Sequence, residues 1–152
     1  MEENKERVRV EGVILMEGGI ALMHRKDVKK RPDMQEYYTF PGGGIEETDK
    51  SYEDGVIREI KEEFGIDVKV IKKLYKMESK KFNQKEIFYL CEYIGGKFGT
   101  GNGPEFSNNP KYIDSGKYIP EIVPIEEICK ISLMPTEAKE AILKKISKNT
   151  CN

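Results

Sequence analysis

The sequence predicts a mixed α/β fold, in a single domain that spans residues 1–152. Three observations favour this class. Short apolar runs of strand type occupy much of the chain, residues 51–64 repeat their apolar positions with helical spacing, and a second helical segment follows further on. A chain of 152 residues is long enough to bury a substantial core in one domain, and no internal repeat indicates a second.

The apolar runs predict a series of strands. We expect them at residues 8–16, 20–23, 37–40, 68–77, 86–93 and 118–124. Glu17-Gly18-Gly19 is typical of a hairpin turn between the first two. The run at 86–93 contains a continuous apolar stretch, as central strands do. Pro120 and Pro124 lack the backbone N–H that a central strand needs, which places 118–124 at an edge.

Helical spacing predicts one helix in the middle of the chain and one near its end. The first begins near Ser51, where a hydroxyl can cap the first turn, and ends at Gly65, a residue type that favours a C-terminal cap. Its buried stripe is expected to be Tyr52, Val56, Ile60 and Phe64. The second runs from residue 135 or 136 to 146, with Ala138, Ile142 and Ile146 inward. Residues 125–128 are expected to form a single helical turn.

A long segment, residues 95–116, lacks a regular pattern and is rich in Gly, Asn and Pro. Irregular segments of this length inside a domain usually carry function or lack order. Its run Gly99-Thr100-Gly101-Asn102-Gly103 resembles a nucleotide loop only superficially. Neither a following helix nor a Gly-Lys-Ser/Thr sequence is present, so Rossmann and P-loop sites are excluded.

Charge and cysteine content exclude several functions. The 26 basic and 27 acidic residues leave a net charge of −1, so bulk electrostatics predict no affinity for nucleic acid or a membrane surface. No apolar run approaches the roughly 20 residues that cross a bilayer, and the N-terminal residues are not typical of a secretory signal. Three widely spaced cysteines and one histidine predict neither a disulfide framework nor a zinc site. We therefore expect a cytoplasmic protein.

Three glutamates carry most of the chemical information. Glu59, Glu62 and Glu63 stand at positions i, i+3 and i+4 of the central helix, so all three project toward one side. Like charges in this arrangement repel one another, and a solvated, salt-bridged helix surface is the ordinary alternative. A hard divalent cation such as Mg²⁺ resolves the repulsion, because it binds several carboxylate oxygens. Upstream, the glycines 42–44 let the backbone approach the same ion or a phosphate.

The segment from Gly43 to Ile66 resembles the signature box of the Nudix hydrolases. Its second half, Arg58-Glu59-Ile60-Lys61-Glu62-Glu63-Phe64-Gly65-Ile66, matches every fixed position of that box. In the first half, the acid expected after Gly43 falls on Asp49, and one extra residue separates it from Arg58. We interpret this as a one-residue insertion before the helix, with Asp49 as a shortened replacement for the usual glutamate.

The resemblance implies a fold and a reaction. The fold is an α/β/α sandwich with a mixed sheet between helices. The reaction is a Mg²⁺-dependent hydrolysis, with Mn²⁺ as the alternative cation, of a nucleoside diphosphate linked to another moiety, by water attack on phosphorus. The metal ligands it implies are Glu59, Glu63, Glu62 and a backbone carbonyl of Gly42 or Gly43. Arg58 is expected to orient a carboxylate through a bidentate contact.

The remaining site residues are less strongly indicated. The general base is a glutamate of the box or an acid on a later loop, for which Glu105 and Glu121 are the candidates. Arg25, after the second strand, is a candidate phosphate clamp, and the glycines 42–44 are candidates for substrate contact; an exposed basic loop is the alternative for Arg25. A monomer and a homodimer are both compatible with the sequence.

Several alternatives to a nucleotide hydrolase stay open. The proline and tyrosine markers that accompany ADP-ribose and dinucleoside-polyphosphate specificity in this family have no match near residues 81–84, which favours nucleoside triphosphates or nucleotide sugars. A non-catalytic nucleotide-sensing module is the second hypothesis, and action on the 5′ end of RNA is the third. An isomerase of the same fold would need a cysteine at the site, whereas Cys91 lies in an apolar strand.

Overall fold

The computed structural model describes residues 5–29, 32–33, 36–106 and 115–146. Its elements are, in order, β1 (Arg7–Met16), β2 (Gly19–Lys26), β3 (Tyr37–Thr39), β4 (Gly42–Gly44), α1 (Tyr52–Phe64), β5 (Ile66–Ser79), β6 (Gln84–Gly96), η1 (Pro104–Phe106), β7 (Lys117–Pro124), η3 (Ile125–Lys130), β8 (Leu133–Met134) and α2 (Thr136–Ile146). The predicted mixed α/β class is confirmed, and every predicted strand and helix is present within a few residues of its expected bounds.

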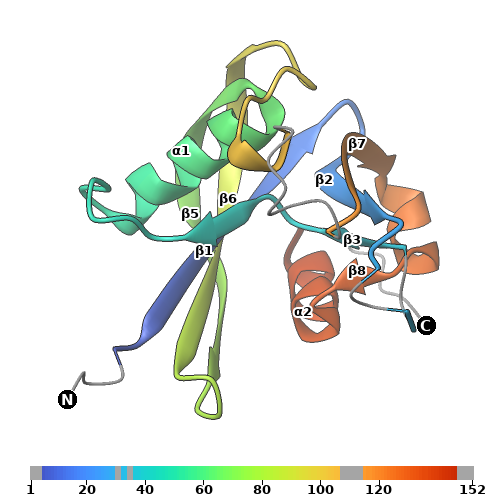
Figure 1. Ribbon diagram of the computed structural model, residues 1–152. Coiled ribbons are helices and arrows are strands. Elements are labelled where there is room, and N and C mark those ends of the chain that lie inside the picture. Colours follow the sequence, from blue (N-terminus) through green and yellow to red (C-terminus); the bar gives the residue numbers. More distant parts are fainter. Residues whose placement is uncertain (1–4, 30–31, 34–35, 107–114, 147–152) are drawn as a thin grey trace.

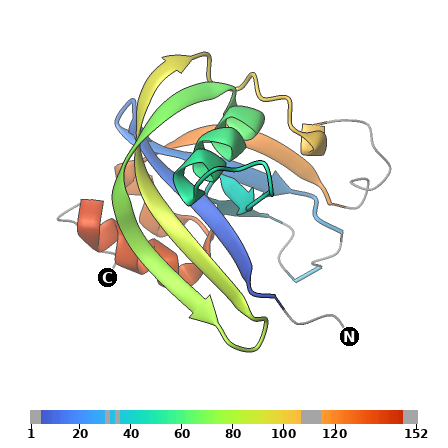
Figure 2. The ribbon, with the colours of Figure 1, turned by 90° about the vertical axis from the view of Figure 1, so that its left-hand side faces the viewer.

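The strands form one mixed sheet in the order β5-β6-β1-β2-β3-β8, with β4 added to β1 and β7 added to β2. The pairs β1–β6 and β3–β8 are parallel, and the others are antiparallel. As predicted, β6 is central and β7 pairs with one strand only among the described residues. Figures 1 and 2 show α1 and α2 on opposite sides of the strands, with the β5–β6 hairpin extending beyond the rest of the sheet.

Strand β1 divides the sheet. Its N-terminal part pairs with β4 at Arg9–Glu11, and its C-terminal end pairs with β2 at Leu15–Met16. Since β6 already occupies the other edge of β1, β4 and β2 lie along the same edge and diverge from each other. The fork between them lies next to the glycine strand.

Two apolar clusters cover the two sides of the sheet. On one side, the predicted stripe Val56, Ile60 and Phe64 of α1 is buried against Val10 and Ile14 of β1. On the other, α2 buries Ala138 and Ile142 in a cluster with Phe88 and Leu74. Leu143 joins this cluster as a buried residue, and Ile146 packs against it partly exposed. Burial of each large apolar side chain contributes about 1.5–3 kcal/mol, so both helices are fixed to the sheet by their apolar sides.

The β5–β6 hairpin is longer than the sequence predicts. The register between the two strands shifts at three places, next to Asp67, Val70 and Lys73. Each shift interrupts the alternation of inward and outward side chains, so alternation alone does not give the full length of the strand that is predicted at 68–77. Pairing nevertheless runs from Ile66 opposite Gly96 to Ser79 opposite Gln84.

The cysteine spacing predicts no disulfide framework, and on this point the two described cysteines differ. Cys91 is a free, buried thiol in β6, and burial raises its pKa to about 12. Cys129, in contrast, is disulfide-bonded, because a widely spaced pattern of cysteines does not reveal which of them the fold brings together. None of the helices among the described residues has the length and apolar character needed to cross a membrane. The cytoplasmic location stays a prediction.

The glycine-rich run after β6 caps the C-terminal end of α1. Helix α1 ends at Phe64 and is capped by Gly65. The Phe64 carbonyl accepts a hydrogen bond from Gly99 N–H (2.9 Å), and the Glu62 carbonyl accepts one from Gly103 N–H (2.8 Å). At Gly101 the backbone comes so close that a β-carbon would lie 2.4 Å from the carbonyl oxygens of Glu62 and Glu63. This packing carries η1, and with it Glu105, back toward the helix.

We expect Gly101→Ala to destabilise the protein by about 1–3 kcal/mol, because the added methyl group meets backbone atoms that cannot turn away. Urea unfolding followed by circular dichroism measures the change. Gly95→Ala is the matched control, since a β-carbon there meets only a side-chain atom 3.9 Å away. Equal stability of the two variants would show that the loop does not depend on its contact with the helix end.

Candidate active site

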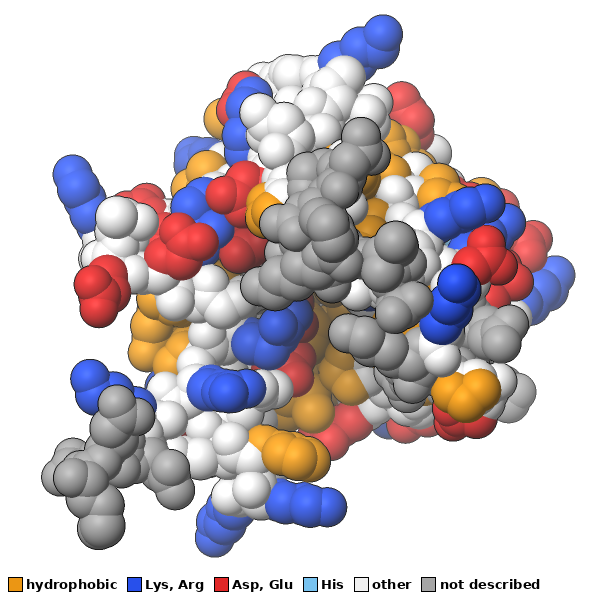
Figure 3. All heavy atoms as spheres, in the orientation of Figure 1, with side chains coloured by type: hydrophobic (Ala, Val, Ile, Leu, Met, Phe, Trp, Pro, Cys, Tyr) orange, Lys and Arg blue, Asp and Glu red, His pale blue; other side chains and the backbone are white. Residues whose placement is uncertain are grey.

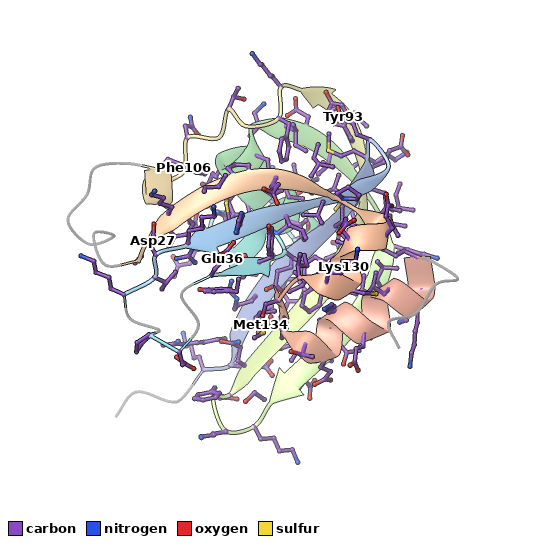
Figure 4. The ribbon with its side chains drawn as sticks, turned by 90° about the vertical axis from the view of Figure 1, so that its right-hand side faces the viewer. Asp27, Glu36, Tyr93, Phe106, Lys130 and Met134 are labelled. Atoms are coloured by element: carbon purple, nitrogen blue, oxygen red, sulfur yellow. The ribbon has the colours of Figure 1, made fainter. Side chains whose placement is uncertain are left out.

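A cavity of about 640 Å³ opens at the fork between β4 and β2. Figure 3 shows the surface hollowed in the middle of this face, with acidic and apolar side chains at its floor. In Figure 4, Phe106 marks η1 and Met134 marks β8. Glu105 of η1, Met134 of β8 and the following Pro135 line the cavity. Its charged lining residues are Arg9, Glu11, Arg25, Glu46, Glu59, Glu62, Glu63, Glu86 and Glu105.

The structure brings most of the predicted site residues to this cavity. Glu59, Glu62 and Glu63 line it from α1, Gly42 and Gly43 from β4, Arg25 from β2 and Glu105 from η1. Arg58 and Gly44 do not line it. Glu121 is also elsewhere: its carboxylate lies 3.6 Å from Nδ1 of His24, and it hydrogen-bonds Tyr38. Glu105 is therefore the one later acid of the two candidates that reaches the cavity.

The glycine strand is held close to the helix by Glu63. Gly42 N–H donates to Oε2 of Glu63 at 2.8 Å. In the β1–β4 ladder, Gly12 N–H donates to the Pro41 carbonyl and Ile45 N–H donates to the Val8 carbonyl. In an antiparallel pair, backbone groups point toward and away from the neighbouring strand in alternation, so the N–H and C=O of Gly42 point away from β1. At Gly43, a β-carbon would lie 2.7–2.9 Å from the carboxylate of Glu59. Of the two carbonyls that the sequence analysis considered, the Gly42 carbonyl is thus the one outside the ladder.

Arg58 connects the helix to the loop before it. Its Nε and Nη2 each donate to one oxygen of Asp49 at 2.9 Å, the bidentate contact expected of this arginine. Its Nη1 lies 3.1 Å from Glu59 and 3.2 Å from Glu62. Nη2 also donates to the Gly44 carbonyl at 3.2 Å. The extra residue in the loop therefore leaves the pairing of acid and arginine intact, and the Asp49 side chain is only 4% exposed.

The cavity is strongly acidic, and its carboxyl groups affect one another. Burial raises the pKa of Glu63 well above its ordinary value, and the neighbouring Glu59 and Glu105 raise it further. Burial also raises the pKa of Glu59, against the opposing effect of Arg58. The pKa of Glu105 is raised by burial and by Glu62. Such groups favour a site that receives positive charge.

The donor set fits a divalent cation. Oε1 of Glu105 is buried without a hydrogen-bond partner, and Nη1 of Arg58 already lies between Glu59 and Glu62 as a positive charge. As the side chains stand, no three acidic, histidine or cysteine residues of the described part converge on one metal-sized position. Carboxylates from the helix, with the Gly42 carbonyl, are nevertheless the hard oxygen ligands that Mg²⁺ prefers.

Arg25 is not a free phosphate clamp in this structure. Its Nε donates to the Lys117 carbonyl at 3.4 Å and its Nη2 to the Ser115 carbonyl. The guanidinium also lies 3.7 Å from the ring centroid of Tyr118 and 5.7 Å from that of Tyr37. The Arg25 guanidinium and the Tyr118 ring together form one wall of the cavity. Because Nε and Nη2 already donate to carbonyls, Arg25 presents to a ligand mainly the flat face of its charged group.

Sequence reasoning missed Glu11, a buried acid at the floor of the cavity. Glu11 lies in β1, is 5% exposed, and pairs across the sheet with Gly42 and with Phe88. The signal that marks it is a carboxylate in the middle of the apolar run 8–16, because buried acids are rare unless they are paired or functional.

Comparisons with known proteins agree with the fold and the site. A NUDIX domain model matches residues 5–142. An ADP-ribose pyrophosphatase from Streptococcus suis 89-1591 is 19% identical, covers 96% of each chain and superposes with a TM-score of 0.64. A MutT NUDIX hydrolase from Burkholderia pseudomallei is 22% identical over 94% of this chain and 99% of its own, with a TM-score of 0.64. A NUDIX hydrolase from Nitrosomonas europaea is 15% identical over 95% and 74%, with a TM-score of 0.69. The search of curated proteins gave no match.

The structural likenesses lie below 25% identity and establish the fold. The family model goes further, because it spans most of the chain, including the carboxylate helix and the glycine strand that meet at the cavity. The chain therefore belongs to the Nudix family, whose hydrolases act on phosphoric anhydride bonds.

Proposed function

We propose that this single-domain protein is a Mg²⁺-dependent pyrophosphohydrolase, with Mn²⁺ as the alternative cation. Its substrate class is a nucleoside diphosphate linked to another moiety, such as a nucleoside triphosphate or a nucleotide sugar. The observation that carries the proposal is the convergence of Glu59, Glu63 and Glu105 with Gly42 on one cavity. The neighbour described as an ADP-ribose pyrophosphatase supports the class of nucleotide pyrophosphates.

The residues that would hold the cation are Glu59, Glu62, Glu63 and the Gly42 carbonyl. A divalent cation bound there would polarise a P–O bond, neutralise phosphate charge and lower the pKa of a bound water. Arg58 acts as a positioning residue, because it fixes Asp49 and the helix carboxylates without lining the cavity. Gly43 allows the phosphate-facing backbone to lie against Glu59.

Glu105 is the general base in this proposal. It lines the same cavity as the helix carboxylates, and its Oε1 has no hydrogen-bond partner. Burial raises its pKa above the ordinary 4.5, and a base accepts protons more effectively as its pKa approaches neutrality. The free oxygen would take the proton from the attacking water, and the Arg25–Tyr118 wall would contact the organic part of the substrate.

The first test is hydrolysis of a panel of nucleoside triphosphates, nucleotide sugars and dinucleotides, with Mg²⁺ and with EDTA. We expect Mg²⁺-dependent release of a nucleoside monophosphate from one class. Glu63→Gln should lower the rate at least about 100-fold, because an amide replaces a charged ligand. Its stability should change little, since the glutamine oxygen still accepts from Gly42 N–H.

Glu140→Gln is the matched control for this test, because Glu140 is exposed on α2. Normal activity of Glu63→Gln would contradict the metal assignment. Tight nucleotide binding without turnover in the unmodified protein would favour the sensing module, and RNA binding with a steep salt dependence would favour action on RNA.

Asp49 generates a prediction about stability. The hydrogen bond from Arg58 holds the pKa of Asp49 below its ordinary 3.8, so ionised Asp49 stabilises the folded state above that value. We expect Asp49→Asn to lose about 2–3 kcal/mol of unfolding free energy at pH 7. The deficit should shrink as the pH falls below about 4, because the aspartate of the unmodified protein then becomes neutral too.

Urea unfolding of both proteins from pH 7 to pH 3 measures this difference. Because Glu63 is unchanged, activity per folded molecule should fall less in Asp49→Asn than in Glu63→Gln. A stability deficit that is constant with pH would mean that the Asp49–Arg58 pair does not depend on charge.

A further inference from the structure

The floor of the cavity holds a carboxyl group that the proposed reaction does not use. Glu11 lines the cavity from β1, and its side chain is 7% exposed. Among the described residues, only two buried side-chain polar atoms lack a hydrogen-bond partner, Oε2 of Glu11 and Oε1 of Glu105. Both belong to residues that line this one cavity. Glu105 has a role in the proposed reaction, whereas Glu11 has none.

The neighbours of Glu11 leave this oxygen without a donor. Nε of Arg9 lies 3.7 Å from Oε1, which is too long for a hydrogen bond. Glu86, which pairs with Arg9 across the sheet, accepts its own bond from Gln84 at 3.0 Å. The Glu11 and Glu86 carboxyl groups are themselves hydrogen-bonded, which requires a shared proton, and that single bond still leaves Glu11 one oxygen that only accepts.

Folding gives no reason for an acid at this position. Glu11 pairs with Phe88, a fully buried residue of the α2-side cluster, and Val13 two residues along β1 belongs to the same cluster. An apolar side chain of similar size would continue that packing. Burying a polar group without a partner destabilises a protein by about 1–3 kcal/mol, so an unpartnered acceptor here is better explained by a ligand.

The surrounding charge restricts which part of a ligand reaches Glu11. Glu63 and Glu86 are its acidic neighbours. A cation held by Glu63 would offset one of these charges, but an ionised phosphate still has no donor to offer the Glu11 oxygen. An uncharged or cationic N–H or O–H donor is favoured instead. We propose that Glu11 is a specificity-determining residue that accepts a hydrogen bond from an amino or hydroxyl group on the organic part of the substrate. This inference rests on the proposed function for its substrate class.

The test uses pairs of nucleotides that differ in one donor: GTP and ITP, ATP and purine riboside triphosphate, CTP and UTP, and ATP and dATP. The first three pairs report on a base amino group and the last on the ribose hydroxyl. We expect the unmodified protein to prefer the donor-bearing member of at least one pair. Glu11→Gln should lower kcat/KM for that member about 10- to 100-fold and for its partner by less than about 3-fold.

The same discrimination should appear in binding without turnover. Calorimetric titration of the corresponding nucleoside monophosphates in EDTA measures it independently of hydrolysis, so a failure of the proposed reaction is distinguishable from a failure of this inference. Glu92→Gln, an exposed substitution on β6, is the control and should leave the preference unchanged.

Glu11→Leu separates a binding role from a structural one. We expect its thermal unfolding temperature to equal or exceed that of the unmodified protein, because an apolar side chain removes an unpartnered acceptor, while the substrate preference is lost. A marked drop in unfolding temperature would overturn the inference in favour of a structural acid. An unchanged substrate preference in Glu11→Gln would also overturn the inference. So would an equal loss of kcat/KM for both members of every pair together with a higher Mg²⁺ requirement, because that result would assign Glu11 to the cation site.

Discussion

The guanidinium of Arg58 is the interaction on which the candidate site depends. It binds Asp49 of the loop, Glu59 and Glu62 of the helix, and the carbonyl of Gly44 in the glycine strand. Three segments are thereby fixed relative to one another. The side chain is 20% exposed, so its bonds are partly shielded from solvent and its charge offsets the repulsion among the helix carboxylates.

This arrangement divides the acids of the cavity into two groups. Glu59 and Glu62 are already balanced by Arg58, whereas Glu63 is held by a backbone N–H and Glu105 keeps an unpartnered oxygen. Burial and other acids raise the pKa of Glu63 and of Glu105, and the more distant Arg9 and Arg25 offset this only in part. Positive charge is therefore favoured where β4, α1 and η1 meet, and the folded chain supplies the frame for it.

Local sequence patterns were sufficient for the elements that frame the site. The apolar stripe of α1, its serine cap and its terminal glycine all point to one helix with defined ends, and the structure has that helix. Asp49 was identifiable because the family box requires an acid there, and the bidentate bond shows that a loop one residue longer still reaches Arg58. Spacing along the chain decided these features.

Contacts between distant segments were beyond such patterns. The fork at β1 depends on β4 and β2 pairing with the same edge of that strand. The contacts of Arg25 with the Tyr118 ring and with the carbonyls of residues 115 and 117 join segments some ninety positions apart. The strand β5 was predicted, but its register shifts depend on the pairing with β6 and were not. Cys129 shows the same limit, since cysteine spacing alone does not report proximity.

The cavity concentrates the departures from ordinary packing. The two buried oxygens without partners, at Glu11 and Glu105, belong to residues that line this cavity, and glycine 43 faces a carboxylate where any other residue would collide with it. In the clusters beneath α1 and α2, by contrast, the buried residues are apolar and follow the predicted stripes. Among the described residues, the buried side-chain oxygens without partners occur at this one cavity, where they are retained at a cost to stability. Ligand binding would account for both oxygens together, because the attacking water at Glu105 and a substrate donor at Glu11 would give each of them a partner.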